Sequence, residues 1–379
     1  MISLFKKDFL MPVLKRWIKI LTTPLPKKNY ILVLATSIFF FLLYHLIIWT
    51  FLTSKVFDAA PYYIGDLGRM SYQVDSLFPR ISSNTLAAKH FDGTNWNNEP
   101  IDLITIGDSF SNGGGAGKNP YYQDYLAMQQ HINILNIQNI DKNFGYIDTI
   151  RYLHQHKWFE KVRPKAILIQ SIEREVLNKV STQKKLPLIP QNKINDYLFK
   201  KSFTDKFPKT MLINTANYSA PYYYIRYRFS THAKKEIYKF SLTHNLFTSQ
   251  DRNHLLVLHD DINNISTFTD KSVTQLNNEL NVLSDELKKD GITLLFMPCA
   301  DKYDLYYDYI ENKNKYPKNP FFLLLEKQPR HYHLVDTKKM LHPLLEKNIQ
   351  DLYYADDTHW SYKASEKIAN DPIFTFLHK

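Results

Sequence analysis

The pattern of apolar and polar residues divides this chain of 379 residues into a membrane-spanning part and a larger globular part. Residues 30–52 are apolar almost throughout and contain no Asp, Glu, Lys or Arg. About 20 such residues are enough to cross a hydrocarbon core of about 30 Å, so we predict a transmembrane helix there. A cleaved signal peptide would end in small residues, whereas this segment ends in Trp49, Phe51 and Leu52.

Beyond residue 100, short apolar runs alternate with longer polar ones. Apolar strands separated by helical stretches are typical of a parallel sheet covered on both faces, and we therefore expect an α/β fold. Residues 269–289 have the strongest helical pattern, because their apolar side chains recur on one face and Gly291 follows the end. Strands are predicted at residues 101–107, 132–137, 165–170, 292–298 and 333–336.

The distribution of charge predicts the orientation of the membrane helix. Residues 1–29 carry seven Lys and Arg side chains against one Asp, which accounts for +6 of the formal net charge of +11. Since positively charged flanks stay in the cytoplasm, the N-terminus is predicted to lie inside and the rest of the chain outside. The basic charge is then a topology signal, and nucleic acid is not expected as a partner. Apolar residues among these lysines predict either an amphipathic helix on the inner leaflet or a basic tail without regular structure.

A glycine-rich turn follows the first predicted strand of the globular part. Five of the ten glycines of the chain lie between Gly107 and Gly117, and Ser109 stands among them. Such a turn presents a hydroxyl at the carboxyl end of a sheet, which is where open α/β folds bind their ligands. Glycine also lets a reacting carbonyl approach the backbone N–H groups closely. Ser109 is therefore a candidate nucleophile.

A second segment, residues 354–360, offers the groups that would activate this serine. A serine hydroxyl becomes a good nucleophile when a base takes its proton, and the base needs a third group to hold its ring. His359 is the candidate base. Asp357 or Asp356 is the candidate carboxylate that orients it.

The sequences GDSFS and DDTHWS, in this chain order, resemble the two ends of the SGNH (GDSL-type) hydrolase superfamily. They look most similar to the SGNH-like O-acetyltransferases of the alginate acetylation type, in which the aspartate lies two residues before the histidine. That pattern favours Asp357 and leaves Asp356 as the second candidate. Residues 121–127, 164–174 and 294–307 also fit the resemblance.

The resemblance implies a three-layer αβα sandwich with a mainly parallel five-stranded sheet, of the flavodoxin-like kind. It also implies a membrane-anchored O-acyltransferase of the bacterial cytoplasmic membrane that acts on a surface polysaccharide or cell-wall glycan in the periplasm or outside the cell. Acetyl-CoA is cytoplasmic, so a polytopic membrane acyltransferase of the MBOAT type is the expected partner that delivers the acyl group. No cofactor and no metal are expected, because the sequence has no phosphate-binding loop and no Cys/His cluster.

One feature of the family is missing here. The usual hydrolase has an Asn after its third strand that donates to the oxyanion, and this chain reads Gln170, Ser171, Ile172, Glu173, Arg174 at that place. The oxyanion is then expected to be held by backbone and side-chain donors from Ser109, Gly113, Gly114 and Arg174. Trp360 and Tyr121 are the candidate substrate-binding residues.

The chain is thus divided into a leader (1–29), a transmembrane helix (30–52), a juxtamembrane linker (53–100) and an SGNH-like catalytic domain (101–379). Relative to a minimal domain of that kind, residues 181–266 are an insertion. Its aromatic and basic run at 218–235 is interpreted first as a packed helix with a solvated basic edge, and second as a surface for sugar rings or lipid headgroups.

Two other functions fit the same residues. One is a carbohydrate esterase or deacetylase, in which water replaces the sugar as acceptor. The other is a non-catalytic protein of polysaccharide modification that only keeps the fold, with the glycine turn as an ordinary connection and residues 356–361 as a helix start. Cys299 is the only cysteine, so no intrachain disulfide is possible, and a buried structural role is expected for it.

Overall fold

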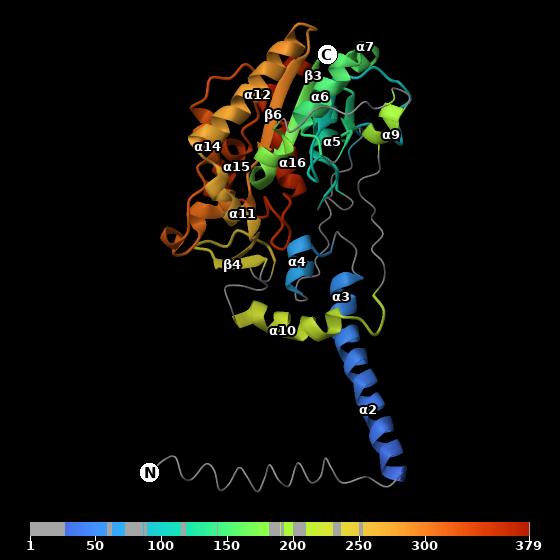
Figure 1. The fold of residues 1–379 in the computed structure, drawn as a ribbon. Helices are drawn as coiled ribbons and strands as arrows, with labels where there is room; N and C mark the ends of the chain where they lie inside the picture. The colour runs from blue at the N-terminus through green and yellow to red at the C-terminus, as the bar shows by residue number, and fades with distance from the viewer. Residues whose placement is uncertain are drawn as a thin grey trace.

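The computed structural model describes residues 27–58, 63–72, 86, 89–114, 119–141, 143–181, 190, 193–199, 210–229, 236–249 and 253–378. Its centre is a five-stranded parallel sheet in the order β2-β1-β3-β6-β7 (Figure 1). The prediction of an α/β fold around such a sheet is confirmed, and each predicted strand region contains one strand. The strands are β1 (Leu103–Ile106), β2 (Ile134–Ile137), β3 (Ala166–Ile172), β6 (Thr293–Cys299) and β7 (His333–Leu334).

The apolar runs form these strands because both faces of the sheet are covered. Every residue of β1, β2 and β3 is buried. Helix α12 (Asp270–Lys288) contacts β6 and also packs against α6, α8 and α14, whereas α5 packs against α16. The other helices of the globular part are α5 (Tyr122–Gln130), α6 (Tyr146–Gln155), α7 (Trp158–Val162), α8 (Val176–Lys179), α11 (Asp260–Asn263), α13 (Lys302–Tyr306), α14 (Phe321–Glu326), α15 (Thr337–Glu346) and α16 (Tyr362–Ala369).

Helix α12 forms where the sequence predicted it. Thr269 is its N-cap, and the Thr269 side chain accepts a hydrogen bond from the Ser272 N–H at 3.2 Å. Such a cap satisfies one of the backbone donors that a helix start leaves free. The buried face is the predicted apolar stripe of Val273, Leu276, Leu280, Leu283 and Leu287.

A long apolar helix projects from the body of the protein (Figure 1). It consists of α2 (Lys27–Ile48), a π-helical stretch (Trp49–Thr53) and α3 (Ser54–Phe57). In the described part of the chain, Lys28–Phe57 is the one helix whose length and composition would let it cross a membrane. It extends beyond the predicted 30–52 because its last turns pack on protein, as the burial of Leu52 and Val56 shows. The predicted amphipathic leader lies outside the described residues, except for its last three.

The linker and the insertion meet next to this helix. The linker contains α4 (Asp66–Ser71), and the insertion contains α9 (Ile194–Leu198), α10 (Ala216–Phe229) and an antiparallel hairpin of β4 (Ile237–Ser241) and β5 (His254–Leu258). The hairpin, which the sequence did not predict, packs on α4 through a small buried cluster of Leu67, Ile237 and Leu256. The linker is therefore a folded part of the domain where it is described.

Candidate active site

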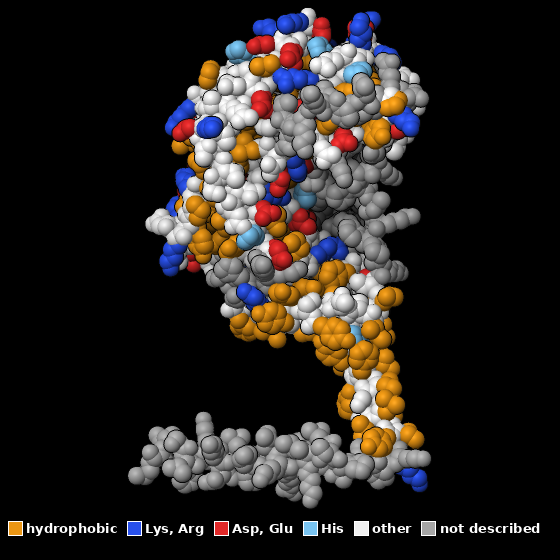
Figure 2. Space-filling view, viewed as in Figure 1, with side chains coloured by type: hydrophobic (Ala, Val, Ile, Leu, Met, Phe, Trp, Pro, Cys, Tyr) orange, Lys and Arg blue, Asp and Glu red, His pale blue; other side chains and the backbone are white. Residues whose placement is uncertain are grey.

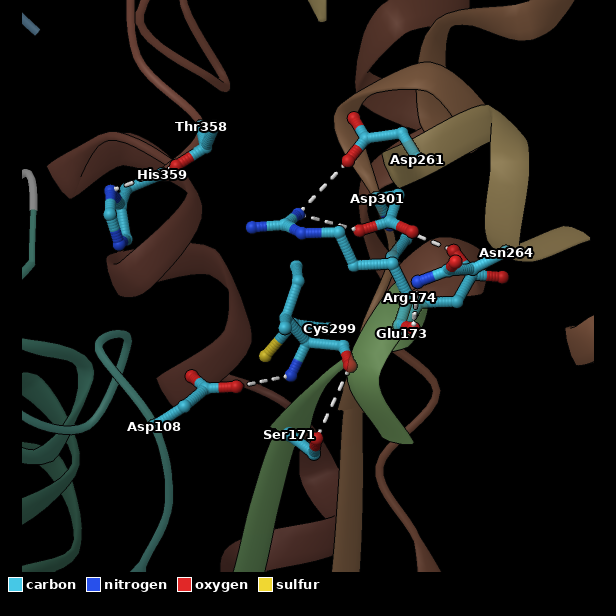
Figure 3. Close-up of polar contacts among 12 residues, drawn as sticks. Asp108, Ser171, Glu173, Arg174, Asp261, Asn264, Cys299, Asp301, Thr358 and His359 are labelled. Atoms are coloured by element: carbon cyan, nitrogen blue, oxygen red, sulfur yellow. Dashed lines mark hydrogen bonds and ion pairs between the residues drawn. The ribbon is translucent and has the colours of Figure 1, made fainter. Parts of the chain in front are cut away.

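The glycine-rich turn after β1 is tied to the end of the neighbouring strand β3. The Asp108 carboxylate accepts a hydrogen bond from the Ile172 N–H at 2.6 Å (Figure 3). It also accepts one from Gln170 Nε2 at 2.8 Å. The Gln170 Oε1 in turn accepts from the Asp108 N–H at 3.1 Å and from the Ser111 hydroxyl at 2.8 Å. These bonds hold the turn outside the carboxyl ends of β1 and β3. In a sheet of this strand order, chain connections leave in opposite directions at that point and open a crevice for ligands.

The turn presents Ser109 to His359, although 250 residues separate the two in sequence. His359 Nε2 lies 2.7 Å from the Ser109 hydroxyl, and His359 Nδ1 lies 2.7 Å from Asp357 Oδ1. Asp357 Oδ1 also accepts from the His359 backbone N–H at 3.0 Å, so one carboxylate fixes both the ring and its backbone. Ser109 is partly exposed, whereas His359 and Asp357 are buried. The structure thus brings together the three residues that the sequence proposed as nucleophile, base and orienting acid.

Asp356, the second candidate for the orienting acid, has a different partner. Its Oδ2 accepts a hydrogen bond from the Gly65 N–H at 2.9 Å, and its carbonyl accepts from the Gly68 N–H at 2.8 Å. A Cβ atom on Gly65 would lie 2.2 Å from the Asp356 carbonyl oxygen, so the backbones can approach this closely only with glycine. Asp356 therefore docks helix α4 onto the loop that carries His359.

The same helix brings a further carboxylate, Asp66, to the histidine. Asp66 accepts hydrogen bonds from the Thr358 N–H and the Thr358 hydroxyl, and its Oδ2 lies 3.8 Å from His359 Nδ1. Desolvation and the negative charge of Asp357 raise the pKa of Asp66 to about 6, although 40% of its side chain remains exposed. The sequence analysis missed Asp66 because no motif marks it.

The pKa of His359 reflects two opposing effects. Burial disfavours the charged imidazolium, but the charge and hydrogen bond of Asp357 and the charge of Asp66 outweigh burial and raise the pKa above its ordinary value of 6.5. A ring with a raised pKa accepts a proton readily from an attacking hydroxyl. The ring must be neutral to do so, which makes any such reaction faster as the pH rises.

Lys302 holds the backbone of the loop that carries His359. Its buried ammonium group donates to the carbonyls of Tyr354 at 2.7 Å, Ala355 at 2.7 Å and Asp357 at 3.1 Å. Burial lowers the pKa of Lys302 to about 8 despite the nearby carboxylates. Three carbonyls use all three donors of an ammonium group, so the loop backbone before His359 is held in one shape. The sequence analysis did not single out Lys302. The one indication in the sequence was that Lys302 lies in residues 294–307, which fit the resemblance.

The candidate oxyanion donors differ in whether their backbone N–H groups already have an acceptor. The Gly114 N–H donates to the Ser109 carbonyl at 2.6 Å and would have to leave this acceptor to bind an oxyanion, so its assignment stays a prediction. Within the described residues, the backbone N–H groups of Ser109 and Gly113 have no acceptor. These two N–H groups lie in the same turn as the Ser109 hydroxyl.

Arg174 extends from the end of β3 toward the side of the site on which His359 lies (Figure 3). Its Nη1 is held by Asp261 at 3.0 Å and by Asp301 at 2.9 Å. Burial opposes the charge on Arg174, but these two carboxylates outweigh that effect and raise its pKa. Arg174 is therefore a fixed cation beside the site and remains a candidate donor.

The two candidate substrate-binding residues have different surroundings. Trp360 is only 5% exposed and packs edge-on against Phe110, with ring centres 4.7 Å apart, which is a packing role; its contact with substrate stays a prediction. Phe110 also contacts the His359 ring, with 4.9 Å between ring centres. Trp360 therefore helps to position His359 through Phe110. Tyr121 is half-buried beside Gly113, and its substrate contact stays a prediction.

One group in the described part of the chain has the composition of a metal site. Asp66, Asp357 and His359 each offer a ligand atom, and these atoms lie within 4.8 Å of one another. However, both oxygens of Asp66 accept hydrogen bonds from Thr358, and His359 Nδ1 faces Asp357. A cation would have to displace these bonds, so the donor set fits an orienting cluster for the histidine better than a metal site.

No protein-family model, no curated protein and no solved structure matches this chain. The interpretation of the site therefore rests on its geometry and on the sequence motifs.

The first prediction concerns pH. Since the neutral form of His359 is the base, the rate of Ser109 modification by a fluorophosphonate should rise with pH, with a midpoint above 6.5. Asp66→Asn removes a negative charge that raises this pKa, so the midpoint should move to lower pH. Asp285→Asn, which removes an exposed carboxylate of α12, should leave the midpoint unchanged. Identical profiles for all three proteins would contradict the role assigned to Asp66.

The second prediction concerns the space beside the base. A Cβ atom on Gly114 would lie 2.4 Å from His359 Nε2 and 2.7 Å from the Ser109 Cβ. Gly114→Ala should therefore separate the two side chains and slow the modification of Ser109 by on the order of 10²-fold or more, the effect of a misplaced reacting group. Circular dichroism should show an unchanged fold. A folded variant that reacts at the wild-type rate would show that this contact does not matter.

Proposed function

We propose that this chain is a membrane-anchored O-acyltransferase, similar to the SGNH-like acetyltransferases, that modifies a surface polysaccharide or cell-wall glycan outside the cytoplasm. The observation that carries the proposal is the hydrogen-bonded series from Ser109 through His359 to Asp357 at the carboxyl edge of the sheet. Helices α12 and α15 pack on β6 and α8 packs on β3, which is consistent with a helix-covered sheet of that superfamily.

In the first step, the Ser109 hydroxyl attacks the carbonyl carbon of the donor ester or thioester. His359 Nε2 takes the serine proton, while Asp357 holds the Nδ1–H and stabilises the imidazolium. The oxyanion is held by the N–H groups of Ser109 and Gly113 and by the charge of Arg174, and each such donor contributes roughly 3 kcal/mol to lowering the barrier. When the carbonyl re-forms, the donor leaves with the proton of His359 and an acyl-serine remains.

In the second step, a hydroxyl of the glycan attacks the acyl-serine. His359 takes the hydroxyl proton, a second oxyanion forms in the same place, and the proton returns to the Ser109 oxygen as the glycan ester leaves. Both steps transfer an acyl group without a change of oxidation state, so they call for no redox cofactor.

The long apolar helix supports a location at the membrane, and the basic leader predicts that the domain lies outside. Acyl-CoA is confined to the cytoplasm, so the acyl group must cross the membrane before it reaches Ser109. The proposed partner that carries it across is a polytopic acyltransferase of the MBOAT type, as the resemblance implies.

Hydrolysis is the alternative outcome at the same site. Ser109 is partly exposed, so water can reach an acyl-serine unless the acceptor excludes it. An esterase and a transferase share the first step and differ only in the acceptor. The ester content of the glycan therefore distinguishes them, because a transferase adds esters and an esterase removes them.

The third prediction is the test of this proposal. The ester content of surface glycan, released by mild base, should fall to background in cells that carry Ser109→Ala at wild-type protein level, because the nucleophile contributes at least about 10⁴-fold to the rate. Ser266→Ala, which changes an exposed serine, should retain wild-type ester content. A rise in esters in the Ser109 variant would show a deacetylase, and an unchanged content would show a non-catalytic protein.

A further inference from the structure

Helix α10 of the insertion presents an apolar stripe to its surroundings. Tyr218, Tyr222, Ile225 and Phe229 are each between 57% and 84% exposed. Their spacing of four, three and four residues places them on one face of the helix. A helix in water is expected to turn such a face toward the core, so this exposed stripe is unusual.

The opposite face of α10 packs on protein, and within the stripe Tyr218 also contacts the end of α2, where it stacks on Tyr44 with ring centres 6.1 Å apart. Ala220 is fully buried in a cluster with Leu52 and Tyr72, and Tyr223 stacks on Tyr72 with ring centres 5.8 Å apart. The core-facing side of the helix is therefore already occupied. The first interpretation of this run, a packed helix with a solvated basic edge, accounts for that side only.

Polar contacts fix α10 across the end of α2. The Asn217 Nδ2 lies 2.8 Å from His45 Nδ1, and the Asn217 Oδ1 accepts from the Thr53 hydroxyl at 2.7 Å. The Tyr44 hydroxyl donates to the Asn217 carbonyl, and the Tyr218 hydroxyl lies 3.0 Å from His45 Nε2. Figure 1 shows the result, in which α10 lies crosswise on α2. This also explains the single imidazole in the apolar helix, since it is buried against α10.

The length of α2 sets the height at which α10 lies. At 1.5 Å per residue, about 20 residues from Lys28 span a hydrocarbon core of about 30 Å and reach Ile47. The contacts with α10 begin at Tyr44 and His45, which is the far boundary of that core. Figure 2 shows hydrophobic side chains along the projecting helix and across the underside of the body, where α10 lies.

Basic side chains flank the stripe. The Arg226 guanidinium lies 6.0 Å from the ring centre of Tyr222, and the Arg228 guanidinium lies 4.9 Å from that of Tyr224. Met211, Leu212 and Ile213, just before α10, are also exposed. Tyrosines with arginines at the boundary of the hydrocarbon are typical of helices that lie in the headgroup region, where the rings contact acyl chains and the cations contact phosphates.

We propose that α10 is an interfacial helix whose exposed stripe lies in the headgroup region of the leaflet at the C-terminal end of α2. The occupant of the stripe is lipid. The bilayer contact then holds the domain at a fixed height and orientation above the membrane. This proposal does not depend on the proposed chemistry, because it rests on α10 and α2 alone.

The fourth prediction measures the depth of this stripe. Cys299 is the only cysteine and is buried, so Ile225→Cys in the full-length protein can be labelled selectively with a fluorophore. In vesicles of phosphatidylethanolamine and phosphatidylglycerol, lipids with a quencher close to the headgroup should quench this label strongly. Leu323→Cys is the matched control, because Leu323 has the same exposure of 57% but lies on α14, away from α2 (Figure 1). Its label should be quenched little.

Two results would overturn the proposal. Equal quenching at the two positions would show that the stripe stays in water. Protection of Ile225→Cys from a water-soluble maleimide in native membranes, without quenching in the pure lipid vesicles, would show that another membrane protein covers the stripe. Neither result would alter the test of Ser109 on glycan esters.

Discussion

The hydrogen bond between His359 and Ser109 is the contact on which the rest of the site depends, because it joins two segments 250 residues apart and a small displacement would break it. Each side is therefore held by buried polar groups. Asp108 and Gln170 hold the serine turn to β3, and Lys302 holds the backbone of the histidine loop through three carbonyls. Polar groups of this kind are costly to bury without partners, so their bonds specify one arrangement of the two segments.

The loop that carries His359 is also linked to the long apolar helix near the N-terminus. Gly65 and Asp66 bond to Asp356 and Thr358, on either side of the orienting acid. Helix α4, which carries them, packs against the hairpin of the insertion and contacts α10, which in turn is fixed to the end of α2. The linker and the insertion, which look like additions to the domain in sequence, thus form a continuous connection from the apolar helix to His359.

The confirmed predictions came from local patterns in the sequence. Apolar runs identified the five parallel strands because those strands are buried on both faces, and the stripe from Val273 to Leu287 identified α12. The motifs identified Ser109, Asp357 and His359 as neighbours. Asp66 could not be found this way, since its contact spans about 290 residues without a motif. The hydrogen bond of the Gly114 N–H within its own turn and the packing of Trp360 on Phe110 could not be read from the sequence either, because both depend on tertiary structure.

The central claim is that Ser109 is a nucleophile activated by His359, and trapping of the acyl-serine tests it most directly. The purified protein would be mixed with an activated acetyl ester, quenched in acid, digested and analysed by mass spectrometry. The account predicts one acetyl group on the peptide that carries Ser109 in the wild-type protein, and none on the same peptide of His359→Ala. An unmodified Ser109 in a protein that still consumes the ester, or equal acetylation of both proteins, would contradict the account.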